Sequence, residues 1–87
     1  MYIRHAEIKN PNGLHVQSAS KFVQTALKYQ SEIYIINDDE QINAKSILGL
    51  LASTFNFGTK IDLRAEGPDE KEAVNTLCGI IESYTYS

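Results

Sequence analysis

The residues best suited to chemistry form an Asn-Gly-Leu-His stretch at 12–15, directly before a segment with helical spacing. A neutral imidazole is a nucleophile near neutral pH, because its ordinary pKa is about 6.5, so His15 can accept a phosphoryl group. The first turn of a helix exposes backbone N–H groups and the positive end of the helix dipole, and both stabilise a bound anion. We therefore predict a phosphoryl acceptor at His15. The phosphate-binding residues expected beside it are Val16, Gln17 and Ser18. Asn12 and Gly13 form the expected approach loop, in which Gly13 lets the backbone come close to the site.

The position of a histidine alone does not assign it chemistry, since a functional site is recognised by its neighbouring groups as well. On position alone, a capping or surface role is the more frequent one for a residue such as His15. The other histidine, His5, lies in a strand pattern near the polar residues Arg4 and Glu7, with no second ligand at a suitable spacing. We assign His5 no role.

A second candidate site is Ser46, which precedes a short apolar segment and is expected to cap a helix there. Such a cap contributes on the order of 1 kcal/mol by accepting a backbone N–H bond, and this is the ordinary role of the residue. A phosphate at the same place would meet the favourable end of the helix dipole, so Ser46 is also a candidate regulatory acceptor. The residues Ile47, Leu48 and Leu51 are more apolar than so short a helix can bury, which indicates a partner surface. Core packing of some of them is the alternative.

Length and composition favour a small carrier or binding module. The 87 residues are 43% hydrophobic and 22% charged, which predicts one folded domain over 1–87 with little room for a deep substrate pocket. The net charge of -3, without a cluster of Lys and Arg, argues against nucleic acid as a partner. With Cys78 as the only cysteine, no internal disulfide or cysteine-based metal site can form, and we expect no metal and no cofactor.

No basic segment followed by an apolar stretch stands at the N-terminus, and no apolar run is long enough to span a bilayer. We therefore expect no membrane insertion and a cytoplasmic location.

Hydrophobic spacing divides the chain into elements that position these sites. Period-two patterns predict strands at 2–8, 32–36, 41–43 and 60–66. Helical spacing predicts a helix at 16–29, a short helix after Ser46 that 56–58 would close, and a last helix whose first turn contains Asp69 and Glu70. The apolar face of the first helix is expected to contain Val16, Ala19, Val23, Ala26 and Leu27, and that of the last helix Ala73, Val74, Leu77, Ile81 and Tyr84. The order β-α-β-β-α-β-α predicts an α+β two-layer sandwich, an open sheet with helices on one face and its first strand beside its fourth.

Several stretches resemble a known family in register along essentially the whole chain. They are Pro-Asn-Gly-Leu-His at 11–15, Phe-Val at 22–23, Ser-Glu-Ile at 31–33, Ala-Lys-Ser at 44–46 and Ala-Glu-Gly-Pro-Asp-Glu-Lys-Glu-Ala-Val at 65–74. On these residues the chain resembles HPr, the histidine-containing phosphocarrier of the bacterial phosphoenolpyruvate:sugar phosphotransferase system. The resemblance implies an open-faced β-sandwich with a four-stranded antiparallel sheet and three helices on one face.

The resemblance also implies partners. His15 would accept a phosphoryl group from enzyme I and pass it to the IIA domains of sugar permeases. Ser46 matches a position that a dedicated kinase phosphorylates in many members, where the phosphate weakens carrier activity and promotes binding to a transcriptional regulator.

The chain departs from the family directly after the histidine. The family pattern there is a small residue followed by Arg-Pro-Ala, whereas this chain has Val16, Gln17, Ser18 and Ala19. The family arginine helps to bind the phosphoryl group, and Gln17 offers a neutral amide in its place, which predicts a weaker hold on phosphate. Ser18 restores a backbone N–H and adds a hydroxyl where the family has proline, so anion binding is expected to recover in part by another route.

Three hypotheses remain open at this point. The first is a working phosphocarrier, most simply a monomer because it docks successive partners through one face. The second is a regulatory or binding relative that transfers phosphate weakly or not at all and is controlled at Ser46. The third, a free-standing phosphatase or hydrolase, is disfavoured because no second base, nucleophile or metal cluster accompanies His15.

Overall fold

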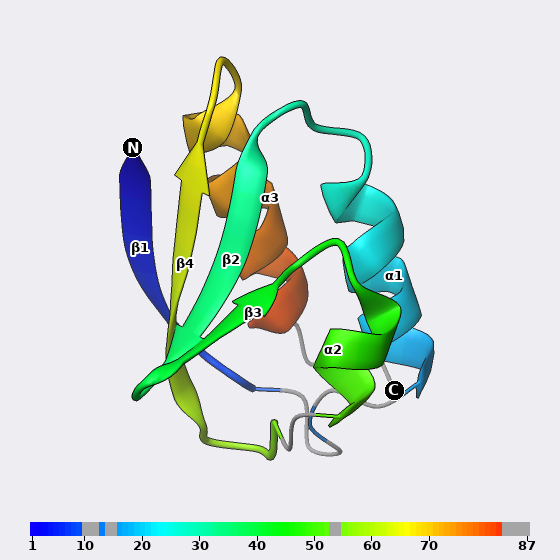
Figure 1. Ribbon diagram of the computed structural model, residues 1–87. Coiled ribbons are helices and arrows are strands. Elements are labelled where there is room, and N and C mark those ends of the chain that lie inside the picture. Colours follow the sequence, from blue (N-terminus) through cyan, green and yellow to red (C-terminus); the bar gives the residue numbers. More distant parts are fainter. Residues whose placement is uncertain (10–12, 14–15, 53–54, 83–87) are drawn as a thin grey trace.

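The predicted elements are all present in the computed structural model of the protein, which describes residues 1–9, 13, 16–52 and 55–82. The strands are β1 Tyr2–Glu7, β2 Glu32–Asn37, β3 Glu40–Asn43 and β4 Lys60–Glu66. The helices are α1 Val16–Ala26, α2 Ile47–Ala52 and α3 Glu70–Ile81. The strands form one antiparallel sheet in the order β1-β4-β2-β3, and the helices cover one of its faces (Figure 1). The open-faced α+β sandwich expected from the sequence is confirmed.

The central strand β4 shows why the alternating pattern was informative. Its apolar residues Ile61, Leu63 and Ala65 are buried beneath the helices, while the intervening polar residues lie on the open face of the sheet. It pairs with β1 on one side and with β2 on the other, so the first strand lies beside the fourth as expected. This strand therefore contributes its apolar side chains to the core and its polar side chains to the open face of the sheet.

The first helix begins where it was predicted, but it ends earlier and two of its expected buried residues are exposed. It ends at Ala26, because Lys28 and Tyr29 donate their N–H groups to carbonyls three residues back, and this tighter turn stops the helix. The expected buried residues Val16 and Leu27 are 68% and 60% exposed, since they lie at the margins of the buried face. The residues at the centre of that face are buried, and they are Ala19, Phe22, Val23 and Ala26. The prediction for Val16 and Leu27 was therefore wrong.

The last helix buries the face that its spacing predicted, apart from Tyr84, which lies outside the described residues. Its buried residues are Ala73, Val74, Leu77, Cys78, Ile80 and Ile81. None of the helices in the described part of the chain is long and apolar enough to cross a membrane.

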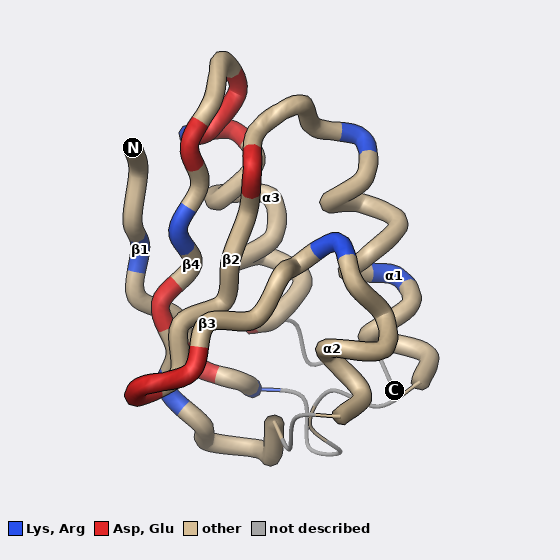
Figure 2. The backbone as a smooth tube through the Cα atoms, in the orientation of Figure 1, with Lys and Arg blue, Asp and Glu red and all other residues tan. Residues whose placement is uncertain are grey.

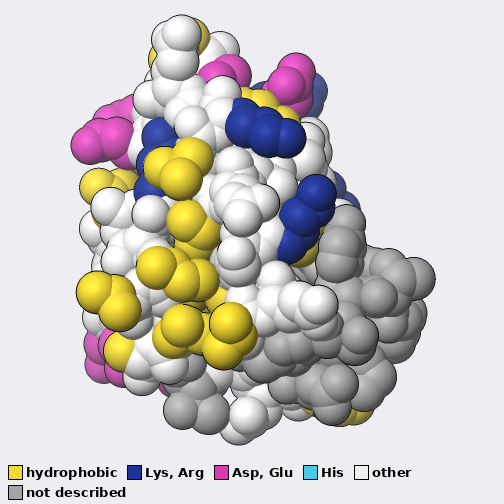
Figure 3. Space-filling view, turned by 90° about the vertical axis from the view of Figure 1, so that its right-hand side faces the viewer, with side chains coloured by type: hydrophobic (Ala, Val, Ile, Leu, Met, Phe, Trp, Pro, Cys, Tyr) yellow, Lys and Arg dark blue, Asp and Glu magenta, His cyan; other side chains and the backbone are white. Residues whose placement is uncertain are grey.

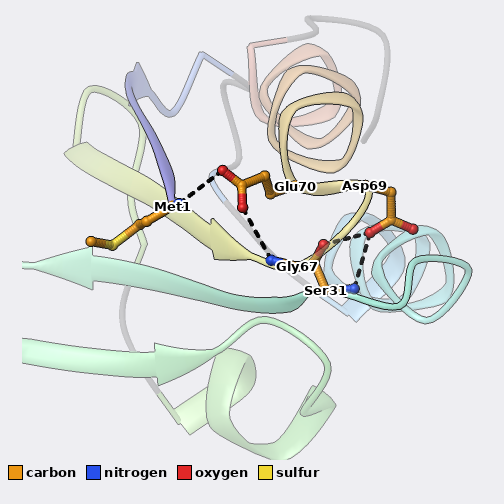
Figure 4. Close-up of polar contacts among 5 residues, drawn as sticks. All are labelled: Met1, Ser31, Gly67, Asp69 and Glu70. Atoms are coloured by element: carbon orange, nitrogen blue, oxygen red, sulfur yellow. Dashed lines mark hydrogen bonds and ion pairs between the residues drawn. The ribbon is translucent and has the colours of Figure 1, made fainter.

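A clamp of hydrogen bonds at the start of α3 joins it to the start of β2 (Figure 4). The Asp69 carboxylate accepts the backbone N–H of Gln30 at 2.9 Å and of Ser31 at 3.0 Å, and the hydroxyl of the fully buried Ser31. The next residue, Glu70, accepts the N–H of Gly67 at 3.1 Å and pairs with the Met1 amino group at 2.9 Å. These two carboxylates therefore hold β2, β4 and β1 against the beginning of α3.

The clamp makes stability depend on acid. Hydrogen bonds from Ser31 and Gln30 lower the pKa of Asp69 below its ordinary value of 3.8. The Met1 amino group and the Gly67 N–H lower the pKa of Glu70 below 4.5. A carboxylate whose pKa is lower in the folded state stabilises the fold fully above its ordinary pKa. That stabilisation is lost as the pH falls through the lowered value, because the proton then binds the folded state too.

We expect the urea midpoint of unfolding to fall as the pH is lowered from about 5 to below 4, and we expect Asp69→Asn to remove part of this dependence. The matched control is Glu72→Gln, which removes an exposed carboxylate from the same first turn of α3. Equal pH profiles for the two variants would contradict the role of Asp69.

Candidate functional site

The candidate phosphoryl acceptor, His15, and Asn12 of the approach loop lie outside the described residues. Their described neighbours are Gly13 and Val16. Helix α1 begins at Val16, the residue that follows His15 in the sequence, so the expected start of the helix is confirmed. The first-turn N–H groups of a helix have no partner further back along it, and they carry the positive end of its dipole.

Gly13 is fixed against a distant part of the chain. It is buried, it has a φ of 70°, and a Cβ built on it would lie 2.3 Å from the carbonyl oxygen of Phe55 and 3.0 Å from the Cα of Asn56. Only glycine fits this contact and this backbone conformation without strain. The close backbone approach expected at Gly13 is thus made to the 55–56 segment of the protein itself.

The residues that replace the family Arg-Pro pair are placed differently from each other. Gln17 is exposed at the start of α1. Ser18 is only 2% exposed, and its hydroxyl donates to the Gly13 carbonyl oxygen at 3.5 Å, a long and weak hydrogen bond. The side chain of Ser18 therefore points into the protein and towards the loop before His15. A contact from Ser18 to a phosphate would use its backbone N–H.

Ser46 caps α2 as expected. Its hydroxyl accepts the N–H of Gly49 at 3.1 Å, and its carbonyl accepts the N–H of Leu50 at 3.1 Å. The turn before it is closed by Asn43, whose side chain accepts the Lys45 N–H at 2.9 Å. The half-buried Ser46 hydroxyl thus has a structural partner at the start of the helix.

An apolar surface lies on the side of the molecule formed by α1 and α2. Leu48 is 78% exposed and Leu51 is 42% exposed, whereas Ile47 is half-buried and packs against the core. Val16, at the start of α1, is also exposed. Figure 3 shows hydrophobic side chains gathered on this side of the protein. We call Val16, Leu48 and Leu51 the apolar patch. Exposed apolar residues that lie together on one side of a protein are typical of sites that bind partners.

The acidic residues are distributed unevenly along the chain, which the net charge of -3 does not show. None of the 11 Asp and Glu residues lies within 8–31 or 41–61, the segments that carry α1 and α2. Lysines occur on α1 and just before α2, while acidic residues follow the strands, the β2–β3 turn and the start of α3 (Figure 2). A partner with acidic groups around an apolar surface would therefore be attracted to the side that carries the apolar patch.

Other reactive side chains lie apart from this region. His5 on β1 pairs with Asp62 on β4, and its side chain is 89% exposed on the open face of the sheet. Burial raises the pKa of the Cys78 thiol to about 11, so it is not a nucleophile near neutral pH. Among the described residues, no group of three or more His, Cys, Asp or Glu side chains is placed to hold a metal ion.

Comparison with known proteins agrees with this geometry. The family model described as "PTS HPr component phosphorylation site" matches residues 3–83. The phosphocarrier protein HPr of Neisseria meningitidis is 41% identical over 78 residues, which are 90% of this chain and 88% of the relative. The HPr-like protein Crh of Halalkalibacterium halodurans is 42% identical over 82 residues, which are 94% of this chain and 98% of the relative.

Among solved structures, HPr-C-His from Thermoanaerobacter tengcongensis has a TM-score of 0.90 and 44% identity, and the match covers 95% of this chain and 93% of that one. The similarity thus extends over nearly the whole length of each chain, with relatives of both the HPr and the Crh kind.

Proposed function

This chain belongs to the HPr family of the bacterial phosphotransferase system, and from that premise we propose that it is a phosphocarrier that accepts a phosphoryl group on His15. The donor is enzyme I, and the acceptors are the IIA domains of sugar permeases. The observation that carries the proposal is the start of α1 at Val16, directly after His15. The first-turn backbone groups of Val16, Gln17 and Ser18 would stabilise the phosphate there.

The reaction needs no cofactor. A ring nitrogen of His15 attacks the phosphorus atom carried by enzyme I, so that a P–N bond forms on His15 as the bond to the donor breaks. The same exchange in the other direction delivers the phosphoryl group to a IIA domain. Because positioning and charge stabilisation supply most of the catalysis in phosphoryl transfer, a small domain is sufficient. The fixed position of Gly13 against Phe55 supports such positioning.

The apolar patch is the proposed docking surface for these partners, together with Ile47 at its edge. Its residues Leu48 and Leu51 are exposed on α2, and no acidic residue occurs in the segments that carry α1 and α2. Each partner would cover the same surface in turn, so the working form is a monomer that meets its partners in the cytoplasm.

We propose Ser46 as a regulatory phosphorylation site, acted on by a kinase and read by a transcriptional regulator. Ser46 is the first residue before α2, the helix that carries Leu48 and Leu51. A phosphate adds a charge of about -1.5 to -2 at neutral pH. That charge would stand at the edge of the docking surface, where it would oppose an acidic partner and alter which protein binds.

An alternative is an HPr-like regulatory module whose phosphoryl transfer is weak or absent. It is favoured by the site itself, because the exposed Gln17 lacks the charge of the family arginine and the Ser18 hydroxyl is directed to Gly13. The similarity to the HPr-like protein Crh is consistent with this alternative.

The deciding experiment incubates the purified protein with enzyme I and phosphoenolpyruvate and measures its intact mass. We expect one phosphoryl group per chain that is lost in mild acid, as a P–N bond requires, and that moves to an added IIA domain. The control omits enzyme I and should give no adduct. Failure to form the adduct, under conditions that charge another HPr, would contradict the phosphocarrier and favour the regulatory module.

A further inference from the structure

An aromatic side chain outside the apolar patch is held out into solvent between α2 and β4. Phe57 is 59% exposed, whereas its neighbour Phe55 is 3% exposed and belongs to the core. The Thr59 N–H donates to the Asn56 carbonyl at 3.0 Å, and Gly58 has a φ of 89°. These features define a four-residue turn with Phe57 in its second position and glycine in the third, where positive φ is required.

The turn is fixed to the sheet rather than loosely attached. The Gly58 N–H donates to the Ile8 carbonyl at 2.7 Å, and the Ile8 N–H donates to the Thr59 carbonyl at 2.9 Å. Ile8 follows β1 directly and is fully buried. The backbone that carries Phe57 is thus ordered in advance, and an aromatic side chain has few rotatable bonds, so little further entropy is lost when a partner covers it.

The turn also adjoins the candidate phosphoryl site. Gly13 packs against Phe55 and Asn56, the residues that lead into the turn, and Gly13 precedes His15 by two residues in the sequence. A standard protein interface covers about 800 Å² per partner, which is a patch roughly 30 Å across. A partner that reaches the loop at Gly13 with an interface of that size would also cover Phe57.

We propose that Phe57 is a specificity-determining anchor for the protein that delivers the phosphoryl group, and that this donor presents an apolar pocket to it. The inference rests on the proposed function and extends it to a residue outside the apolar patch. Aromatic side chains are enriched among the few residues that dominate binding energy. A second copy of the chain seated here would cover the loop at Gly13 and hinder the exchange, whereas the donor must reach that loop to deliver the phosphoryl group. The occupant to which we commit is therefore the donor.

The test compares Phe57→Ser with Ile3→Ser in steady-state phosphorylation by enzyme I. Ile3 is a matched control because it is 51% exposed and lies opposite Arg64 on the open face of the sheet, away from α1 and α2. Loss of a binding anchor should raise the KM of enzyme I for the carrier by about tenfold or more while kcat stays within about twofold. The control should keep both constants within about twofold of the wild type.

A second measurement separates docking from positioning of the site. Phosphoramidate is a small phosphoryl donor that needs no protein interface, so Phe57→Ser should be labelled on His15 by it as fast as the wild type. Slower labelling by phosphoramidate, or an unchanged KM with enzyme I, would overturn the anchor role. A wild-type protein that phosphoramidate labels and enzyme I does not would instead contradict the proposed function, and with it the donor as occupant.

Discussion

Replacing His15 with alanine is expected to remove all acid-labile phosphoryl acceptance from enzyme I and to leave the circular dichroism spectrum unchanged. The imidazole supplies the nucleophilic nitrogen, and alanine has no atom that can form the P–N bond. Alanine is also a good helix former, so the start of α1 at Val16 should persist. The measurement is intact mass before and after mild acid.

The matched control is His5→Ala, which removes the other histidine of the chain. His5 is paired with Asp62 on the open face of the sheet, opposite the face that the helices cover. This variant should be phosphorylated as completely as the wild type. Acid-labile label retained in His15→Ala would move the acceptor elsewhere, whereas acid-stable label would indicate an ester such as one on Ser46.

The elements of this fold could be predicted because their signals are local. The alternation of apolar and polar residues in β4 matches its two faces one residue at a time, and the spacing of Ala73, Val74 and Leu77 matches the buried face of α3. In each case one periodic pattern is buried against one neighbouring layer. The position of the first strand beside the fourth was predictable because few arrangements of these elements avoid left-handed crossovers.

Details that depend on distant contacts were not predictable from the sequence. The carboxylates of Asp69 and Glu70 were expected only as negative charge near a helix start. The structure instead uses Asp69 to bind Gln30 and Ser31, which are remote in the sequence. At the two ends of α1, the burial of Val16 and Leu27 depends on how far the neighbouring layers extend, and periodicity carries no information about that.

In the candidate site too, the local features could be predicted and those that depend on distant contacts could not. The helix start after His15 and the cap at Ser46 are both encoded within a few residues. The inward direction of the Ser18 hydroxyl was not, because it depends on where the chain brings Gly13. The sequence places Phe57 in a helix-closing stretch, and the Phe-Gly pair is a local signal for a turn there. The exposure of Phe57 is not encoded locally, because it depends on how the turn is held against Ile8.

Gly13→Ala is expected to be the most destabilising conservative change near the site, lowering the free energy of unfolding by about 2–5 kcal/mol. One part of the cost is the φ of 70°, which an alanine adopts only with strain. The other part is the overlap of its Cβ with the Phe55 carbonyl oxygen at 2.3 Å, a backbone atom that cannot rotate away. Chemical denaturation of both proteins measures the difference.

Gly58→Ala separates these two costs, because Gly58 also has a positive φ, of 89°, but a Cβ built on it meets nothing within 4 Å. We expect this control to lose only the conformational part, about 1–2 kcal/mol. The excess in Gly13→Ala then measures how tightly the loop before His15 is packed against Phe55. Equal losses in the two variants would show that the loop can move away from Phe55 at no cost. In that case the fixed position of Gly13 could not position His15, and the geometry of the exchange would have to come from α1 and the partner alone.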